Sequence, residues 1–257
     1  VFIGCVGTAS AYDQYWIVGD TSLGANWDSA TDAWEMSTND GNIYTLSVSN
    51  VTLTAETTYK FKARNKQSTW DGATSYGCPS NTNDSSNQAY YVESGKGGTY
   101  NLLFVLDISQ SQVGLIILNN LQIKGSFESW TGIDMTSDGD YSYSYTLDLT
   151  SNNSAHTFKF YVDAPGKNYD EDYWIGPSEI ALSNFEYWSG SLSSGDNYQL
   201  NHNIVKGYKK FNITAVWNPC NKIQYGWTFK VTPSEERDGV SKVLFDNAKD
   251  WSNVYAY

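Results

Sequence analysis

Apolar and polar residues alternate with a period of two along many short segments of this chain. The alternation is clear in residues 43–48 and 57–63, and again in residues 141–149 and 156–162. A period of two puts successive side chains on opposite faces of a half-buried β-strand. Turn signals such as Asn39-Asp40-Gly41 separate these segments, and no segment has the periodicity of an amphipathic helix. The pattern therefore predicts an all-β protein built from short antiparallel strands.

The same order of segments occurs twice, in residues 19–61 and 125–160. Each copy has a glycine, a loop with a tryptophan, an Asp-Gly turn, an alternating strand and a second strand that ends in aromatic-Lys-Phe. Ordered matches of this kind indicate an internal repeat. The matched positions include Trp27 with Trp130, Asp40-Gly41 with Asp138-Gly139, and Tyr59-Lys60-Phe61 with Phe158-Lys159-Phe160. We predict two tandem immunoglobulin-like β-sandwich modules plus a C-terminal β segment.

The 257 residues are enough for two domains of ordinary size. We expect an N-terminal arm over residues 1–11, module 1 over residues 12–118 and module 2 over residues 119–233. Residues 234–257 are interpreted as a linker followed by the start of a third β module or an exchanged strand.

Composition narrows the classes of partner. Sixteen basic residues stand against 28 acidic ones, and the net charge of -12 disfavours nucleic acid and anionic membrane surfaces. The chain has no run of about 18 apolar residues, which is the length that a membrane-spanning helix needs. Aromatic residues make up 16% of the chain, including 10 Trp and 20 Tyr, which leaves aromatic side chains for the surface as well as the core.

The cysteines and sequons leave alternatives open. Cys5, Cys78 and Cys220 do not have the spacing of a zinc site, and one disulfide, for example between Cys78 and Cys220, is possible. Asn-x-Ser/Thr sequons, which would carry glycans only in a eukaryotic source, occur at Asn50, Asn83, Asn152 and Asn212.

Each copy resembles the starch-binding β-sandwich modules of carbohydrate-binding families 20 and 48 and their relatives in bacterial surface starch-binding proteins. The residues that carry this resemblance are Val18-Gly19-Asp20, Trp27, Asp40-Gly41, Tyr59-Lys60-Phe61 and Trp70, with Trp174 and Gly176-Pro177 closing the second copy. Residues 243–257 are similar to the opening of family 26 modules. The resemblance implies a secreted or cell-surface, non-catalytic protein that binds an α-glucan such as starch.

The sugar site of the family that the copies resemble has two aromatic platforms. Each copy of this sequence matches one of them. Trp70 and Trp174 match the platform that follows the Tyr-Lys-Phe strand. The position of the other platform holds Ile43 in the first copy and Ser144 in the second. Tyr141 or Tyr143 could substitute in the second copy.

A flat aromatic ring covers the apolar face of a sugar, and neighbouring amides or charged groups bond its hydroxyl rim. Loop aromatics beside such groups are therefore the candidate carbohydrate-binding residues. They are Trp174 with Tyr173 and Asn168, Tyr187 with Trp188, and Trp70 with Lys66 and Gln67. Four other tryptophans are interpreted as packing in the core or plugging a loop: Trp27, Trp130, Trp217 and Trp227.

The sequence gives little support for catalysis. Adjacent loop carboxylates at residues 170–172 are typical of a solvated patch, and no Ser or Cys lies in a nucleophile motif. We expect no enzyme activity and no cofactor. The alternative for Asp163, Asp170 and Asp172 is a Ca²⁺ loop, because their oxygens suit that ion.

A second hypothesis is structural. The apolar arm of residues 1–11 and the strand-like residues 240–257 could each complete the sheet of a neighbouring molecule. The protein would then self-assemble into a surface layer or filament, with any glycans attached at the sequons.

Overall fold

The protein is an all-β chain of β-sandwich modules, which confirms the predicted fold class. The computed structural model describes residues 12–139, 141–151, 154–169, 174–177, 187–192, 197–200, 205, 207–217 and 227–236. The terminal segments on which the strand-exchange hypothesis depends lie outside these ranges. Within them, no helix is long and apolar enough to cross a membrane. The 3-10 helices are η1 (Thr21–Leu23), η2 (Asp32–Trp34) and η3 (Thr82–Asp84).

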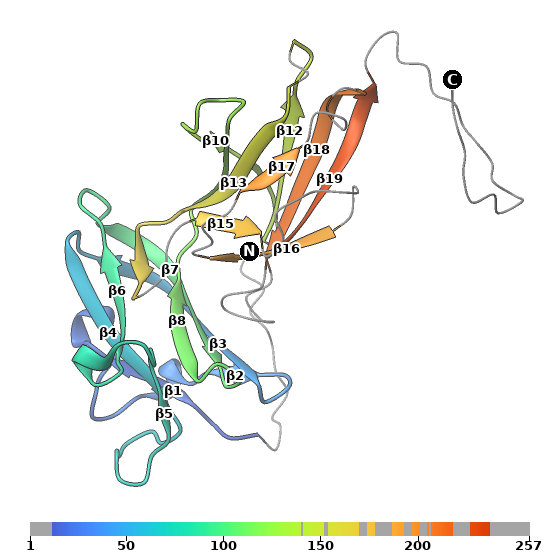
Figure 1. Cartoon of the computed structure of the whole chain (residues 1–257). Coiled ribbons are helices and arrows are strands. Elements are labelled where there is room, and N and C mark those ends of the chain that lie inside the picture. The colour runs from blue at the N-terminus through green and yellow to red at the C-terminus, as the bar shows by residue number, and fades with distance from the viewer. Residues whose placement is uncertain are drawn as a thin grey trace, which may run out of the picture.

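Two antiparallel sheets form the first half of the chain (Figure 1). One sheet has the order β1-β4-β6-β14, with β5 at the end of β4, and the other has the order β2-β3-β7-β8. The strands of the first sheet are β1 (Trp16–Gly19), β4 (Thr57–Arg64), β5 (Ser75–Tyr76), β6 (Gln88–Val92) and β14 (Gly166–Asn168). Those of the second are β2 (Ser37–Thr38), β3 (Ile43–Leu53), β7 (Gly98–Asp107) and β8 (Gln112–Ile116).

The core of this half lies between its two sheets. Ile17, Phe61 and Phe104 are completely buried there, and the rings of Phe61 and Phe104 meet edge to face at 5.2 Å. The alternation seen in the sequence produces this layer, because every second side chain of β4 and β7 points inward. Cys78 is also buried, and it has no disulfide partner among the described residues. Cys5 and Cys220 lie outside them.

The strands of the second half form one continuous sheet that folds over its own core. Its order is β10-β9-β13-β15-β16-β19-β18-β12-β11, with β17 paired to β13. Its strands are β9 (Asn120–Gly125), β10 (Ile133–Asp134), β11 (Thr136–Gly139), β12 (Ser142–Asp148), β13 (His156–Asp163), β15 (Trp174–Pro177), β16 (Tyr187–Leu192), β17 (Tyr198–Leu200), β18 (Tyr208–Trp217) and β19 (Trp227–Glu236). Phe158, Phe160 and Phe229 are buried inside.

Two segments differ from the sequence-based expectation. Residues 187–190, which the sequence predicts as an aromatic loop, belong to β16, which pairs with β15 and β19. Strand β19 continues through Pro233 to Glu236, where a linker is expected. Pro233 lies opposite Phe211 beside a register shift, and such irregularities tolerate a residue that cannot donate a hydrogen bond. Residues 234–236 therefore belong to β19, and the rest of the expected linker lies outside the described residues.

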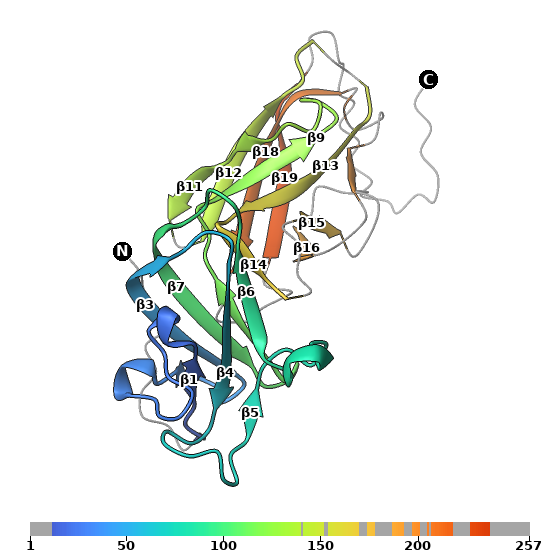
Figure 2. The same ribbon diagram turned by 90° about the vertical axis from the view of Figure 1, so that its left-hand side faces the viewer.

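A short strand from the second half completes a sheet of the first. Strand β14 follows β13 in sequence, yet it pairs with β6 (Figure 2). Asn168 lies on β14 with both polar atoms of its side chain engaged: Nδ2 donates to the carbonyl of Leu115 at 2.8 Å, and Oδ1 accepts from the N–H of Leu115 at 2.9 Å. A Cβ on Gly166 would lie 2.1 Å from the carbonyl oxygen of Tyr91, so this approach requires glycine. We call these contacts the β6–β14 junction.

Candidate functional site

Two indole rings lie side by side on the first half of the chain, in loops far from the second half. Trp27 follows η1, and Trp70 lies in the connection between β4 and β5, which points away from the second half (Figures 1 and 2). Their ring centroids are 6.4 Å apart and their planes are inclined by 31°. Trp70 is 41% exposed and Trp27 is partly buried. We call these residues the first tryptophan pair.

Arg64 holds this pair in place from beneath. Its guanidinium carbon lies 4.5 Å from the centroid of the Trp70 ring, although the residue itself is completely buried. Burial lowers the pKa of the Arg64 guanidinium, and the Asp28 carboxylate opposes that shift. The guanidinium donates to four backbone carbonyls at 2.6 to 3.3 Å, those of Trp27, Asp28, Lys66 and Gln67. One cation therefore joins the two loops that carry the tryptophans.

Polar groups border the first pair. The Trp70 indole N–H donates to the carbonyl of Trp27 at 3.0 Å, which links the two loops again. Gln67 donates from Nε2 to the Asp32 carboxylate at 2.8 Å, and its Oε1 accepts no hydrogen bond from the described residues. Lys66 donates to the carbonyl of Asp71 at 2.7 Å. An indole surface with amide, ammonium and carboxylate groups at its edge suits a flat, hydroxylated ligand.

The second half of the chain carries a matching pair. Trp130 lies between β9 and β10, Trp174 begins β15, and their ring centroids are again 6.4 Å apart, with planes inclined by 62°. Both side chains are partly buried. Tyr161 on β13 adds a third ring, 5.0 Å from that of Trp174. We call Trp130 and Trp174 the second tryptophan pair.

Cations accompany this pair as well, although they come from other strands than Arg64 does. The ammonium of Lys124 on β9 lies 3.8 Å from the centroid of the Tyr161 ring and 5.3 Å from that of Trp174. Lys159 on β13 lies 5.8 Å from the Trp174 centroid. Ammonium groups at these distances are attracted to the faces of the rings.

The backbone around Trp130 is strained. Ser129 and Trp130 have φ values of 60° and 65°, in the left-handed region that bulky residues rarely adopt. Such strain persists only where neighbouring groups enforce it, and it is concentrated at functional sites. Here the Glu128 carboxylate enforces it by accepting hydrogen bonds from Gly125 N at 2.7 Å, Gly132 N at 2.8 Å and the Thr131 hydroxyl at 2.6 Å.

These hydrogen bonds also set the protonation of Glu128. Burial alone would raise the pKa of its carboxyl group, but the hydrogen bonds from Thr131, Gly125 and Gly132 outweigh it and lower that pKa. A group with a depressed folded-state pKa stabilises the fold above its unfolded-state pKa. That contribution is lost as the pH falls through the folded-state pKa.

We therefore expect the loop that carries Trp130 to loosen in acid. An NMR titration should give a midpoint for the Glu128 carboxyl below about 4.3, the ordinary value for glutamate. The amides of Gly125 and Gly132 should shift with the same midpoint. The variant Glu128→Gln should lack this transition, and a midpoint above the ordinary value would contradict the assignment.

The predicted site residues are distributed unevenly. Trp70, Lys66 and Gln67 lie on the same connection between β4 and β5, and Trp174 belongs to the second pair. Asn168 is 4% exposed and occupied at the β6–β14 junction, so we leave it out of the site, which corrects its grouping with Trp174. Tyr173 lies outside the described residues, as do the side chains of Tyr187 and Trp188 on β16. Asp170 and Asp172 are outside them too, and Asp163 forms an ion pair with Lys96 at 3.6 Å.

Neither half has an aromatic platform at the second position that the family resemblance indicates. Ile43 is buried in a cluster with Leu103 and Val105, and the Ser144 hydroxyl bonds Asp138 at 3.1 Å. Tyr141 and Tyr143 line a different cavity.

Trp27 and Trp130 were interpreted as core-packing or loop-plugging residues, and Trp27 does pack against the core of its half as a partly buried residue. Both rings are also partly exposed, and each lies beside the other tryptophan of its half. One signal in the sequence could have found them. Both lie in polar loop sequences, Ala-Asn-Trp-Asp-Ser and Glu-Ser-Trp-Thr-Gly, without the apolar neighbours that a core position has.

No family model matches the chain, and no curated protein matches it. Among solved structures it is similar to SusF from Bacteroides thetaiotaomicron, with 16% sequence identity and a TM-score of 0.38. The match covers 88% of this chain and 50% of that one, so this chain spans about half the length of SusF.

Proposed function

We propose that this protein is a non-catalytic, extracellular carbohydrate-binding protein that binds α-glucan through its two tryptophan pairs. The observation that carries the proposal is the pairing itself. In each half of the chain two partly exposed indoles from separate segments lie 6.4 Å apart, with cations beside them. The buried members of both apolar cores include none of these four tryptophans, and Trp27 packs against its core only as a partly buried residue.

The chemistry of the pairs favours a sugar over other ligands. Sugar rings have an apolar face that an indole covers at little cost in rotamer entropy. The cations at the pairs are occupied by carbonyl oxygens or aromatic faces, which disfavours a phosphate or sulfate ligand. The choice of α-glucan rests on the sequence resemblance to starch-binding modules.

The two tryptophan pairs, each acting as one binding platform, would bind a polysaccharide together. Each exposed platform alone is expected to bind weakly, because a few stacked rings bury little area and leave the ligand partly solvated. Simultaneous binding of two platforms to one polymer multiplies their effects and can raise the apparent affinity by about 10²–10⁴. Loss of either platform should therefore cost more on a long glucan than on a short oligosaccharide.

Affinity electrophoresis in amylopectin tests this proposal. We expect wild-type protein to be retarded, Trp70→Ala and Trp174→Ala each to weaken retardation at least about tenfold in apparent affinity, and the double variant to migrate as in a blank gel. The matched control is Tyr91→Ala, which removes an equally exposed aromatic ring (41%) from β6. Unretarded wild type, or equal retardation of the double variant, would rule the proposal out. Retardation of wild type in a β-glucan gel alone would remove the α-glucan assignment.

A further inference from the structure

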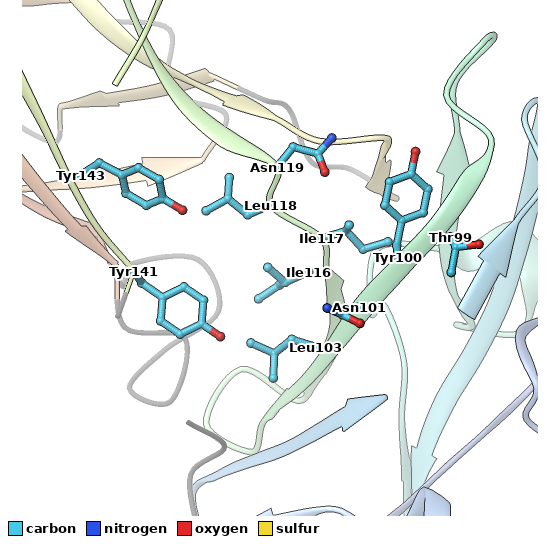
Figure 3. Close-up of a pocket in the computed structure, with 10 residues that line it drawn as sticks. All are labelled: Thr99, Tyr100, Asn101, Leu103, Ile116, Ile117, Leu118, Asn119, Tyr141 and Tyr143. Atoms are coloured by element: carbon cyan, nitrogen blue, oxygen red, sulfur yellow. The ribbon is translucent and has the colours of Figure 1, made fainter. Parts of the chain in front are cut away.

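A cavity of about 280 Å³ lies where β7 of the first half approaches β12 of the second half. Its walls come from β7, from the connection between β8 and β9 and from the start of β12 (Figure 3). It is separate from both tryptophan pairs, since it shares no lining residue with them. Ligand pockets in proteins commonly begin at about 300 Å³, so this volume suits one sugar ring or a fragment of that size.

The lining is uncharged. All ten lining residues are Thr, Tyr, Asn, Leu or Ile, although the whole chain has a net charge of -12. An ionic ligand would leave its charge unpaired in such a site, which is costly. The cavity therefore suits a neutral ligand. Its mixture of apolar, phenolic and amide groups matches a molecule that has both an apolar face and hydroxyls.

The polar groups of the cavity retain bonding capacity. Tyr143 is only 7% exposed, yet its hydroxyl has no hydrogen-bond partner among the described residues. Figure 3 shows the hydroxyls of Tyr141 and Tyr143 pointing toward Leu103, Ile116 and Leu118 across the cavity. A ligand hydroxyl or a water molecule in the cavity could bond to this hydroxyl.

Two amides add to this capacity. Asn119 is exposed, and its side chain has no hydrogen-bond partner in the described part of the chain. Asn101 uses its Oδ1 to accept from the N–H of Asn50 at 3.2 Å, which leaves its Nδ2 as a donor. Leu103 is 6% exposed and provides an apolar surface deeper in the cavity.

The backbone positions one of the rings at a conformational cost. Tyr141 has a φ of 60°, the left-handed conformation that a bulky aromatic residue rarely adopts. Its ring contacts the small apolar cluster of Ile43, Leu103 and Val105 on the outer face of β3 and β7. This packing holds the Tyr141 ring at the wall of the cavity despite the strained backbone.

We propose that this cavity is a separate site for one neutral sugar ring, with Tyr143 and Asn119 bonding its hydroxyls and Leu103 and Ile116 contacting its apolar face. The burial that surrounds Tyr143 raises the pKa of its hydroxyl to about 12, with Tyr141 adding to the shift. The hydroxyl therefore keeps its proton at neutral pH and donates it to a ligand oxygen. The site does not depend on the tryptophan pairs, and it needs both halves of the chain.

Saturation-transfer NMR on the full chain, with glucose and maltose as probes, tests this inference. We expect transfer to the sugar ring protons in wild type and in the Trp70→Ala/Trp174→Ala double variant. Tyr143→Phe removes only the hydroxyl and should weaken binding about 3- to 10-fold. Asn119→Trp, which fills the exposed edge of the cavity, should abolish the transfer that remains in the double variant. The control is Tyr91→Phe, an exposed tyrosine outside the cavity.

The possible outcomes separate this inference from the proposed function. Transfer that is lost in the tryptophan double variant and unchanged in Tyr143→Phe and Asn119→Trp would overturn the cavity site while leaving the tryptophan pairs in place. The absence of transfer from wild-type protein to either sugar would overturn it as well. Transfer retained in the double variant and lost in Asn119→Trp would support it, even if amylopectin does not retard the protein.

Discussion

Replacing Arg64 by alanine is expected to destabilise the protein by about 3 kcal/mol and to remove the first tryptophan pair as a binding surface. The substitution deletes the donors to four carbonyl oxygens and the cation beneath the Trp70 ring. The loops that carry Trp27 and Trp70 would keep the hydrogen bond between Trp70 and Trp27 and those that Gln67 makes with Ala30 and Asp32, but they would lose the cation that reaches both loops. Chemical denaturation measures the first effect, and retardation in amylopectin measures the second.

A conservative variant separates charge from geometry. Arg64→Lys keeps a positive charge near Trp70, but an ammonium cannot reproduce the fork of donors that reaches both loops. We expect its stability and its binding to fall between those of wild type and Arg64→Ala. If Arg64→Ala unfolds at the same denaturant concentration as wild type, Arg64 does not organise this site.

Replacing Asn168 by alanine is expected to weaken the β6–β14 junction by about 2 to 4 kcal/mol. The reason is that the N–H and the carbonyl of Leu115, which is 1% exposed, both lose their partner while staying buried. Hydrogen exchange at the amides of Leu115 and of residues 166–168 should accelerate by a factor of about 30 or more, since opening this junction becomes easier.

The control for that experiment is Lys167→Ala, which lies on the same strand with a half-buried side chain. It should leave exchange at Leu115 close to the wild-type rate. Protection of Leu115 that is unchanged in Asn168→Ala would show that the junction does not depend on this side chain.

Alternation of apolar and polar residues was sufficient to predict the all-β class, because period two has one structural explanation. It could not predict β14 or β16, since both strands are completed by residues far away in sequence. Gly166, Lys167 and Asn168 have no strand-like alternation. They become a strand because β6 offers an open edge.

The site was predicted in part for a similar reason. Trp70 and Trp174 were found through motifs that follow a strand, and Lys66 and Gln67 through their closeness in sequence to Trp70. The partners Trp27 and Trp130 were missed because each pairs with a tryptophan more than 40 residues away in the sequence, and their polar neighbours indicate exposure but not the pairing. Arg64 was missed because the sequence places it at the end of a strand, where an arginine is ordinarily solvated.

The β6–β14 junction means that the boundary along the sequence and the boundary in space do not coincide. A polypeptide cut between residues 118 and 119 would leave the backbone amides and carbonyls of β6 open to solvent on one side. Genetic exchange of either half for an unrelated sandwich would meet the same obstacle. We therefore expect the two halves to be inherited as one unit, because three residues follow the second half in sequence and pair with the first half in space.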